Sequence, residues 1–490
     1  MSVQALRRES TPSIALEQLR ATLDRQRKAF LAADPPSARE RREHLQALLG
    51  MLLDNETRIA EAISSDFGGA GPSGRAIEES RGIEILPTSM ALRHAIRHVR
   101  RWMRPSRRTT HWATWPSRGR VEYVPLGVVG VISPWNYPVT LALGPLAGAL
   151  AAGNRVMLKP SELTPNTSSL LAELISTTFA EDHVTVATGG VDVAQAFSSL
   201  PFDHLLFTGS TSVGRLVMRA ASDKLVPVTL ELGGKSPALI DPAFDIRKEI
   251  GSLVHGKLLN AGQTCVAPDY LLVHEDEVDA VVAALREQIA LHYPRLADND
   301  DYTAIINERH RERLLGYLDD ARDKGATVLD INPGDEAPER FAEHNKIAPT
   351  IVLDVDDSMK IMQDEIFGPL LPIRTFTEID EAIAYVNQNP RPLAAYIYSD
   401  RRRVIERYGR RIVSGALSVN ATTIHFAQDE LPFGGVGASG MGHYHAREGF
   451  ETFSHPKAVY QQLRPNLMHL VAPPYAGKLK ALLIDFLIGS

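Results

Sequence analysis

Short apolar runs alternate with helical patterns over most of this 490-residue chain, and no other feature restricts its possible folds as strongly. The expected strands of the first alternation are residues 128–132, 155–159, 184–187, 204–208 and 227–231, with helices near 139–152, 165–180 and 211–222. A second alternation has expected strands near 270–273, 348–353, 394–398 and 412–419. Such alternation predicts largely parallel sheets that helices cover on both faces. The expected fold class is therefore α/β, with two units in tandem.

Length, charge and cysteine content exclude several classes of protein. A chain of 490 residues is too long for one ordinary core and predicts two or three domains. The net charge of −6 argues against a protein that coats nucleic acid. Cys265 is the only cysteine, which excludes an intramolecular disulfide and a zinc site built from several thiolates. We therefore expect a soluble protein with a cytoplasmic location.

Two segments bear on targeting and membrane insertion. Residues 1–10 contain two arginines but are not followed by the apolar core of a secretory signal. Residues 123–154 carry no charge and are long enough to span a bilayer, yet they contain four prolines and several glycines. We interpret this stretch as a buried strand, a turn and a helix of small residues. No transmembrane segment is expected.

The segment 91–120 has an unusual composition. It contains nine arginines, no acidic residue and three of the four tryptophans. Basic residues interleaved with aromatic ones can bind a nucleic acid or an anionic surface. They can also form the end of a helix and an arm whose arginines pair with acids of another domain or subunit. We favour the arm, because the chain as a whole is acidic, and we expect no nucleic-acid partner.

Three polar residues are candidates for catalysis. Cys265 ends the polar, glycine-containing loop 260–265, where backbone N–H groups can surround an oxyanion, although a lone cysteine is often an inert buried side chain. Glu231 ends an apolar, strand-like run, so it is either capped by a neighbour or has a raised pKa suited to a general base. Asn136 follows the expected strand 128–132 and is either a turn former or an oxyanion donor.

Two elements are candidates for binding a nucleotide. Residues 209–214 follow an expected strand and open a helix, where backbone N–H groups and the helix dipole can hold a pyrophosphate. The pattern departs from G-x-G-x-x-G and is weak by itself. Lys159 and Glu162 stand at the end of an earlier strand, where both side chains can reach ribose hydroxyls.

Together, in this order and spacing, these motifs resemble the aldehyde dehydrogenase superfamily, from about residue 40 to 465. Further matching motifs are the pentapeptide 365–369 (EIFGP) and the glycine-rich run 432–440 (PFGGVGASG). The stretch 439–455 resembles the class 3 branch, which includes the fatty-aldehyde enzymes. Within that branch, residues 101–105 and the extended amino-terminal helices are similar to the bacterial coniferyl aldehyde dehydrogenases.

The resemblance implies a role for each candidate residue. Cys265 would attack the aldehyde and form a thiohemiacetal and then a thioester, while the Asn136 amide and the Cys265 N–H hold the oxyanion. Glu231 would activate the water that hydrolyses the thioester. The cofactor would be NAD, with NADP possible, and no metal is expected. The implied cofactor-binding residues are Trp135, Lys159, Glu162, Gly209, Ser210, Gly214, Leu232, Glu365 and Phe367.

The resemblance also implies a domain organisation. A Rossmann-like cofactor domain would comprise residues 1–105 and 125–232, and a catalytic α/β domain residues 233–425. A β oligomerisation arm would comprise 106–124 and 445–465, and a homodimer is expected. The tail 466–490 contains an amphipathic pattern over 477–488. This helix is too short to span a bilayer, and we expect it to pack on the protein or its partner subunit rather than on a membrane surface.

The expected activity is NAD(P)-dependent oxidation of an aldehyde to the carboxylic acid, with an aromatic substrate such as coniferyl aldehyde or a medium-to-long apolar one. One alternative is a fatty or general aliphatic aldehyde dehydrogenase. A thioester hydrolase with the same Cys, Glu and Asn, and a non-catalytic binding protein, are further alternatives. His443 and His445 alternate, but no cluster of carboxylates or thiols completes a metal site there.

Overall fold

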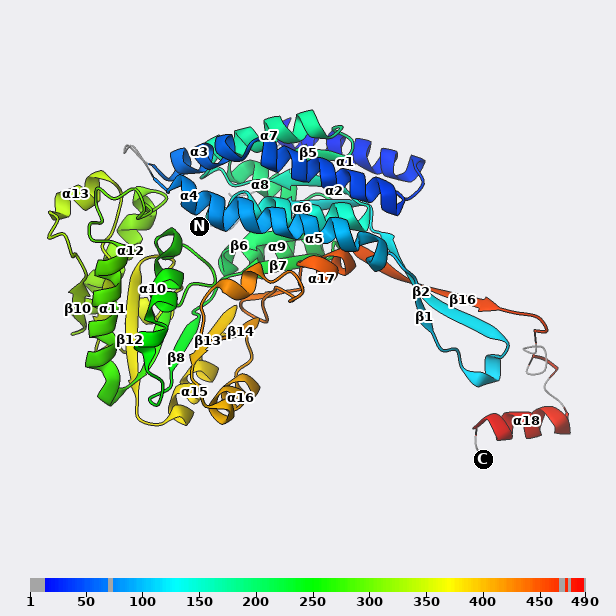
Figure 1. Cartoon of the computed structure of the whole chain (residues 1–490). Helices are drawn as coiled ribbons and strands as arrows, with labels where there is room; N and C mark the ends of the chain where they lie inside the picture. Colours follow the sequence, from blue (N-terminus) through cyan, green and yellow to red (C-terminus); the bar gives the residue numbers. More distant parts are fainter. Residues whose placement is uncertain (1–13, 69–73, 467–471, 475–476, 489–490) are drawn as a thin grey trace, which may run out of the picture.

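The structure is a computed structural model that describes residues 14–68, 74–466, 472–474 and 477–488 (Figure 1). Within these residues the strands form a six-stranded, a seven-stranded and a three-stranded sheet. Helices lie along the two larger sheets, and the three-stranded sheet extends away from them as an arm (Figure 1). The predicted α/β fold class is confirmed.

The six-stranded sheet has the order β15-β7-β6-β3-β4-β5. Its strands are β3 (Val128–Ile132), β4 (Arg155–Lys159), β5 (Val184–Val186), β6 (His204–Gly209), β7 (Val228–Leu232) and β15 (Gly440–Met441). All neighbours pair in parallel except β15, which runs antiparallel to β7. The chain runs from β3 outward through β4 and β5 and then returns to the other side of β3. The carboxyl ends of β3 and β6 therefore form the topological switch point where open α/β sheets bind ligands.

Both faces of this sheet are covered, as the continuous apolar strands require. Val129 and Val131 of β3 pack on one side into the core cluster that also contains residues of several helices. Val128 and Ile132 point to the other side, into the cluster that contains residues of three more. The helices of the first cluster include α2 (Ala38–Asp54), α5 (Leu86–Trp102), α6 (Thr140–Ala152) and α7 (Pro165–Thr178); those of the second are α1 (Ile14–Ala32), α8 (Val191–Ser198) and α9 (Thr211–Ser222).

The seven-stranded sheet has the order β10-β11-β12-β9-β8-β13-β14 and is parallel except for β10. Its strands are β8 (Pro237–Ile240), β9 (Tyr270–His274), β10 (Thr327–Asp330), β11 (Thr350–Leu353), β12 (Leu370–Phe376), β13 (Ala394–Tyr398) and β14 (Ala416–Val419). The α-helices of this part are α10 (Ile250–Leu258), α11 (Val278–His292), α12 (Glu308–Asp323), α13 (Pro338–Glu343), α14 (Lys360–Gln363), α15 (Ile379–Gln388) and α16 (Arg402–Arg411). The predicted strands 270–273, 348–353 and 394–398 all lie in it.

The amino-terminal helices differ from the prediction in one place. The pattern from Ser37 to about residue 64 predicts a single helix, but α2 ends at Asp54 and α3 (Glu56–Phe67) begins two residues later. Asn55 lies between them, outside the helical conformation, and its side chain donates to the Met51 carbonyl at 2.9 Å. Asparagine competes with the backbone for hydrogen bonds in this way and favours helix ends. The short α4 (Ile77–Ser80) and a π-helical turn (Arg81–Ile85) lead into α5.

The arm consists of β1 (Ser106–Arg108), β2 (Ser117–Pro125) and β16 (Ser454–Gln462), all antiparallel. Residues 446–452, included in the predicted arm, instead form α17 (Ala446–Thr452), which lies along α6. The tail helix α18 (Lys478–Ile488) lies beside the arm, where the Phe486 ring is 5.9 Å from that of Trp112 (Figure 1). Among the described residues, no helix is both long and apolar enough to cross a membrane.

Candidate active site

The candidate catalytic residues come from both large sheets. Asn136 follows β3, Glu231 lies in β7, and Cys265 follows a 3₁₀ turn (Leu259–Gly262) at the end of α10. The Asn136 side chain donates from Nδ2 to the carbonyl of Gln263, at 3.1 Å. This bond uses one of the two amide hydrogens and ties the turn after β3 to the loop that carries Cys265.

The loop before Cys265 has an unusual backbone. Asn260, Ala261 and Gly262 have φ values of +52°, +51° and +76°, a left-handed run that ordinary residues adopt only when the surroundings enforce it. The Asn260 amide donates to the carbonyls of Asn136 (3.2 Å) and Gln263 (3.1 Å). A Cβ at Gly262 would lie 2.3 Å from the carbonyl oxygen of Gly368, so glycine is required there. The strained loop is therefore held in one conformation.

The Cys265 thiol lies in an apolar setting next to two carboxyl groups. It is partly buried against the main core cluster. Its pKa is raised to about 12, first by burial and then by the charges of Glu365 and Glu231, while hydrogen bonds from the backbone N–H groups of Cys265 and Val266 act in the opposite direction. The thiol is therefore protonated at neutral pH, and its conversion to a nucleophile requires a proton acceptor.

The carboxyl group of Glu231 is buried, and no hydrogen bond from the described residues offsets the cost of removing it from water. Its side chain is 3% exposed, and neither carboxyl oxygen has a hydrogen-bond partner among the described residues. Burial raises its pKa well above the ordinary value. A buried polar group without a partner costs free energy. Such a group in a folded chain is a candidate for a functional role.

Glu365 is the second carboxyl group beside the thiol. Its Oε1 atom is buried without a partner in the described part of the chain. Burial raises its pKa to about 8, with a further contribution from the charge of Asp269. A Cβ at Gly233 would lie 2.1 Å from Oε2 of Glu365, so the glycine after β7 makes room for this carboxyl group.

Tyr444 also faces the site, and the sequence motifs did not predict it. Its hydroxyl is buried with no partner among the described residues. Its pKa is raised, first by burial and then by the charges of Glu231 and Cys265. The stretch 439–455 contributed to the family resemblance, but nothing in it distinguishes a tyrosine at the site from one in the core.

A buried ion pair anchors the turn that carries Asn136, and it too was not predicted. Arg75 and Glu84 are both fully buried, with Nη1 and Oε1 3.0 Å apart. Arg75 also donates to the Asn136 carbonyl at 3.1 Å, and Oε2 of Glu84 accepts from the N–H groups of Val139 (2.8 Å) and Thr140 (3.1 Å). The pair thus connects the turn to the start of α6. No spacing in the sequence links these residues.

The predicted cofactor residues lie at the carboxyl edge of the six-stranded sheet and in the loop 365–369. Ser210 caps α9, accepting from the Val213 N–H at 3.4 Å. Gly214 packs against Leu232, since a Cβ there would lie 2.6 Å from its side chain. Gly209, at the end of β6, similarly faces the Phe207 ring. These contacts bring the start of α9 close to β6 and β7, as a pyrophosphate site at a helix N-terminus requires.

The remaining cofactor candidates flank this edge. Lys159 ends β4 and is 1% exposed, with Nζ 2.7 Å from the Pro160 carbonyl and 3.8 Å from the half-exposed carboxylate of Glu162. Phe367, with a φ of +51°, contacts Trp135 edge to face at a ring distance of 5.4 Å. Oε1 of Glu365 and Oγ1 of Thr208 in β6 are buried without a hydrogen-bond partner among the described residues, so both can bind a polar group of a ligand. The residues present therefore fit a nicotinamide dinucleotide.

Known proteins agree with this geometry. The sequence profile of the Aldehyde dehydrogenase family matches residues 9–459. The chain belongs to this family. It is 48% identical to a probable coniferyl aldehyde dehydrogenase of Pseudomonas aeruginosa, over 96% of this chain and 97% of that one. These matches confirm the resemblance predicted from the motifs.

Solved structures show the same family fold. The structure described as the substrate-bound state of Staphylococcus aureus AldH covers 95% of this chain and 99% of its own, with 36% identity and a TM-score of 0.88. An NAD⁺ complex of an aldehyde dehydrogenase from Bacillus cereus covers 92% and 89%, with 26% identity and a TM-score of 0.82. This aldehyde dehydrogenase is therefore an NAD(P)-dependent oxidoreductase that converts an aldehyde to the carboxylic acid. Its family decides against a thioester hydrolase and a non-catalytic protein.

Proposed function

We propose that this aldehyde dehydrogenase oxidises aromatic, cinnamaldehyde-type substrates such as coniferyl aldehyde, with NAD as its preferred cofactor. Nearly half of its residues are identical to those of a relative named for coniferyl aldehyde. The observation that carries the proposal is an aromatic-lined cavity whose lining includes Tyr444, on which the charges of Glu231 and Cys265 act.

The cavity lies between α5, α6 and the segment 426–446. Its aromatic lining consists of Trp102, Phe426, Tyr444 and His445. Small residues of α5 and α6 also line the cavity: Ala91, Ala95, Gly144, Ala147 and Gly148. A lining of aromatic rings and small residues suits a planar, conjugated aldehyde, since aromatic pairs gain about 0.5–1.5 kcal/mol beyond the area that they bury.

Cys265 is the proposed nucleophile. Its thiol gives its proton to a water molecule in the site as the sulfur attacks the carbonyl carbon, one S–C bond forms, and the carbonyl π electrons move to the oxygen. The second N–H of the Asn136 amide and the backbone N–H of Cys265 are the proposed donors to this oxyanion. When bound, the nicotinamide accepts the hydride, which leaves the acyl group on Cys265 as a thioester.

Glu231 is the proposed base for hydrolysis of the thioester. A water molecule gives a proton to the carboxylate while its oxygen attacks the acyl carbon, and the C–S bond breaks as the acid leaves. A carboxylate with a raised pKa is a stronger base than an exposed one. The lack of any partner on Glu231 among the described residues leaves both oxygens available for that water.

For the cofactor, the proposed contacts follow the sheet edge. Ser210 and the start of α9 hold the pyrophosphate, Glu365 binds the nicotinamide ribose, and Trp135 and Phe367 pack beside it. Lys159 and Glu162 bind the adenine ribose, where the carboxylate accepts from both hydroxyls of NAD and repels the additional phosphate of NADP.

We also propose a cytoplasmic homodimer that assembles through the arm. Within the described chain β16 pairs only with β2, so its other edge presents unpaired backbone groups, and an exposed edge strand favours pairing with another chain. Light scattering of the full-length protein tests this. A monomer at micromolar concentration contradicts it.

The substrate proposal is tested by kcat/KM for coniferyl aldehyde, benzaldehyde and straight-chain alkanals. Coniferyl aldehyde should give the highest value. Phe426→Ala should lower kcat/KM for coniferyl aldehyde by about three- to tenfold and that for propanal less. Ile424→Ala, an exposed neighbour outside the cavity lining, is the matched control and should leave both unchanged. A preference for alkanals in the parent enzyme contradicts the proposal.

A further inference from the structure

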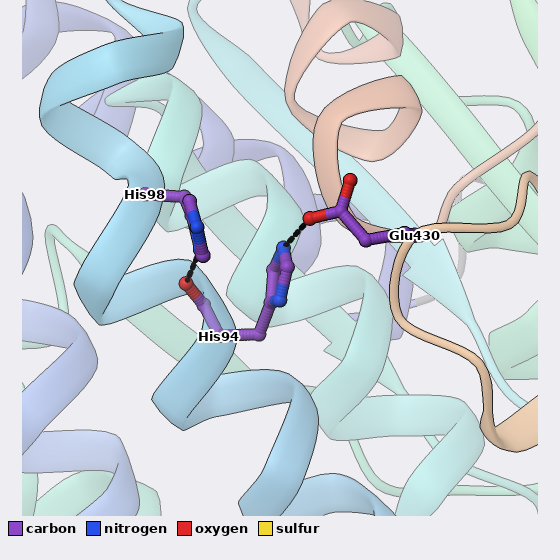
Figure 2. A group of neighbouring side chains, drawn as sticks. All are labelled: His94, His98 and Glu430. Atoms are coloured by element: carbon purple, nitrogen blue, oxygen red, sulfur yellow. Dashed lines mark hydrogen bonds and ion pairs between the residues drawn. The ribbon is translucent and has the colours of Figure 1, made fainter.

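A cluster of possible metal ligands lies on α5, apart from the catalytic residues. It consists of His94, His98 and Glu430, and one ligand atom from each lies within 4.8 Å of the others. Figure 2 shows His94 and His98 on successive turns of α5, with the His94 ring between the His98 ring and the Glu430 carboxylate. Glu430 belongs to the loop that follows a 3₁₀ turn (Ile424–Ala427).

We infer that His94, His98 and Glu430 form a binding site for a divalent transition-metal ion of the zinc type. Two imidazole nitrogens and one carboxylate oxygen are a donor set that Zn²⁺ uses in proteins. Nothing in the proposed aldehyde chemistry uses these three residues.

The separation of the ligand atoms suits such an ion. Nε2 of His94 and Oε1 of Glu430 are 3.1 Å apart. Two ligands bound to Zn²⁺ at about 2.0–2.1 Å with a tetrahedral angle lie about 3.3 Å apart. The Glu430 side chain is 80% exposed and free to rotate toward the ion, while the His94 side chain is 8% exposed and held in place.

The hydrogen bonds around the histidines leave the correct nitrogens for an ion. Nδ1 of His98 is 2.9 Å from the His94 carbonyl oxygen, which only accepts, so the proton is on Nδ1 and Nε2 of His98 keeps its lone pair. Nδ1 of His94 faces the Asp429 carboxylate at 3.9 Å. A metal-bound histidine commonly donates its second N–H to a carbonyl or a carboxylate, as His98 does to the His94 carbonyl. His98 therefore has the outer hydrogen-bond partner of a metal ligand, and the Asp429 carboxylate lies near the second ring nitrogen of His94, beyond hydrogen-bond distance.

The surrounding charges leave the site suitable for a cation. Arg97 lies near enough to act on Asp429. Two carboxylates, Asp429 and Glu430, stand on the opposite element and offset that positive charge. A bound ion would join α5 to the segment 424–430.

The test uses tag-free, chelator-treated full-length protein with Cys265→Ser, so that the thiol cannot bind metal. Calorimetric titration with Zn²⁺ should give one ion per chain. His98→Gln and Glu430→Gln should each weaken Zn²⁺ binding by tenfold or more, and Asp429→Asn by about 10- to 100-fold. The matched controls are His443→Gln and Glu61→Gln, exposed residues of the same types on other elements, and they should bind as the parent does.

Hydrogen exchange tests whether a bound ion joins α5 to the segment 424–430. Zn²⁺ should slow hydrogen exchange of the loop 424–430 in the parent and leave it unchanged in His98→Gln. The inference is overturned if the parent binds no Zn²⁺, or if His98→Gln and Glu430→Gln bind it with the parent's affinity. Both outcomes are independent of which aldehyde the enzyme oxidises.

Discussion

Glu84 and Glu231 are two fully buried carboxyl groups with raised pKa values, and their surroundings are opposite. Glu84 accepts from Arg75 and from two backbone N–H groups at the start of α6. Glu231 accepts from no group among the described residues. The hydrogen bonds of Glu84 offset the cost of burying its carboxyl group, and they hold the turn that carries Asn136 in place. Glu231 forms no side-chain hydrogen bond within the described residues, and its proposed role as a base accounts for its burial.

The largest expected effect is the loss of the nucleophile next to Glu231. Cys265→Ala removes the only thiol, so no thioester forms and turnover should fall by at least about 10⁴-fold. The free energy of unfolding should change far less than the activity does. Steady-state production of reduced cofactor and a urea titration measure the two. Turnover within tenfold of wild type would remove Cys265 from the mechanism.

Glu231→Gln tests whether Glu231 serves catalysis rather than stability. The amide keeps the size of the side chain but cannot take a proton from water, so kcat should fall by about 10²- to 10⁴-fold. Because no described partner is lost and the pKa-linked destabilisation at neutral pH is removed, the free energy of unfolding should not fall below that of wild type. A large loss of stability with little loss of kcat would reverse the roles of the two glutamates.

Glu84→Gln tests the structural half. Removing this charge leaves the Arg75 guanidinium buried without its counterion, which should cost about 3–5 kcal/mol of the free energy of unfolding. Urea denaturation measures the cost, and Glu231→Gln is the matched control. An equal loss of unfolding free energy in Glu84→Gln and Glu231→Gln would contradict the structural role of Glu84.

The two glutamates also predict different pH dependence. Glu231 has a raised pKa, so the folded chain holds a proton that the unfolded chain releases; it therefore destabilises the fold as pH rises above the unfolded value of about 4.3. The same rise in pH supplies the carboxylate base, so kcat should increase. Glu231→Gln should remove that part of both slopes. A pH profile of kcat identical in Glu231→Gln and wild type, apart from its height, would assign the slope to another group.

The smallest effect concerns Glu162, a half-exposed carboxylate with a cation beside it. Glu162→Gln removes the charge that would repel the additional phosphate of NADP. The ratio of kcat/KM for NAD to that for NADP should fall by about tenfold, or 1.4 kcal/mol. Wild-type enzyme that prefers NADP by tenfold would contradict the role proposed for Glu162.

The sequence predicted the strands and site residues that short stretches of neighbouring residues identify. Alternating apolar runs located β3 to β7, and short motifs located Cys265, Glu231 and Asn136. Strands β8 and β12 were not predicted because one begins with Pro237 and the other contains Pro372, and proline argues against a central strand. The helix α8 was also missed.

Contacts between distant parts of the chain could not be predicted in the same way. Arg75 and Glu84 look like ordinary charged residues in sequence, and only the fold buries them against the Asn136 turn. His94 and His98 have a visible helical spacing, i and i+4, but their third partner, Glu430, stands far along the chain. Tyr444 reaches the site only because the strand β15 returns the chain to β7.

The most direct test of the account is the intact mass of Glu231→Gln after incubation with NAD and coniferyl aldehyde. If Glu231 acts after the acyl group has been transferred, this variant should accumulate one acyl group per chain, located on Cys265, while wild type shows none at steady state. Loss of turnover in Glu231→Gln with no adduct on Cys265 would contradict it, because Glu231 would then be needed before the thioester forms.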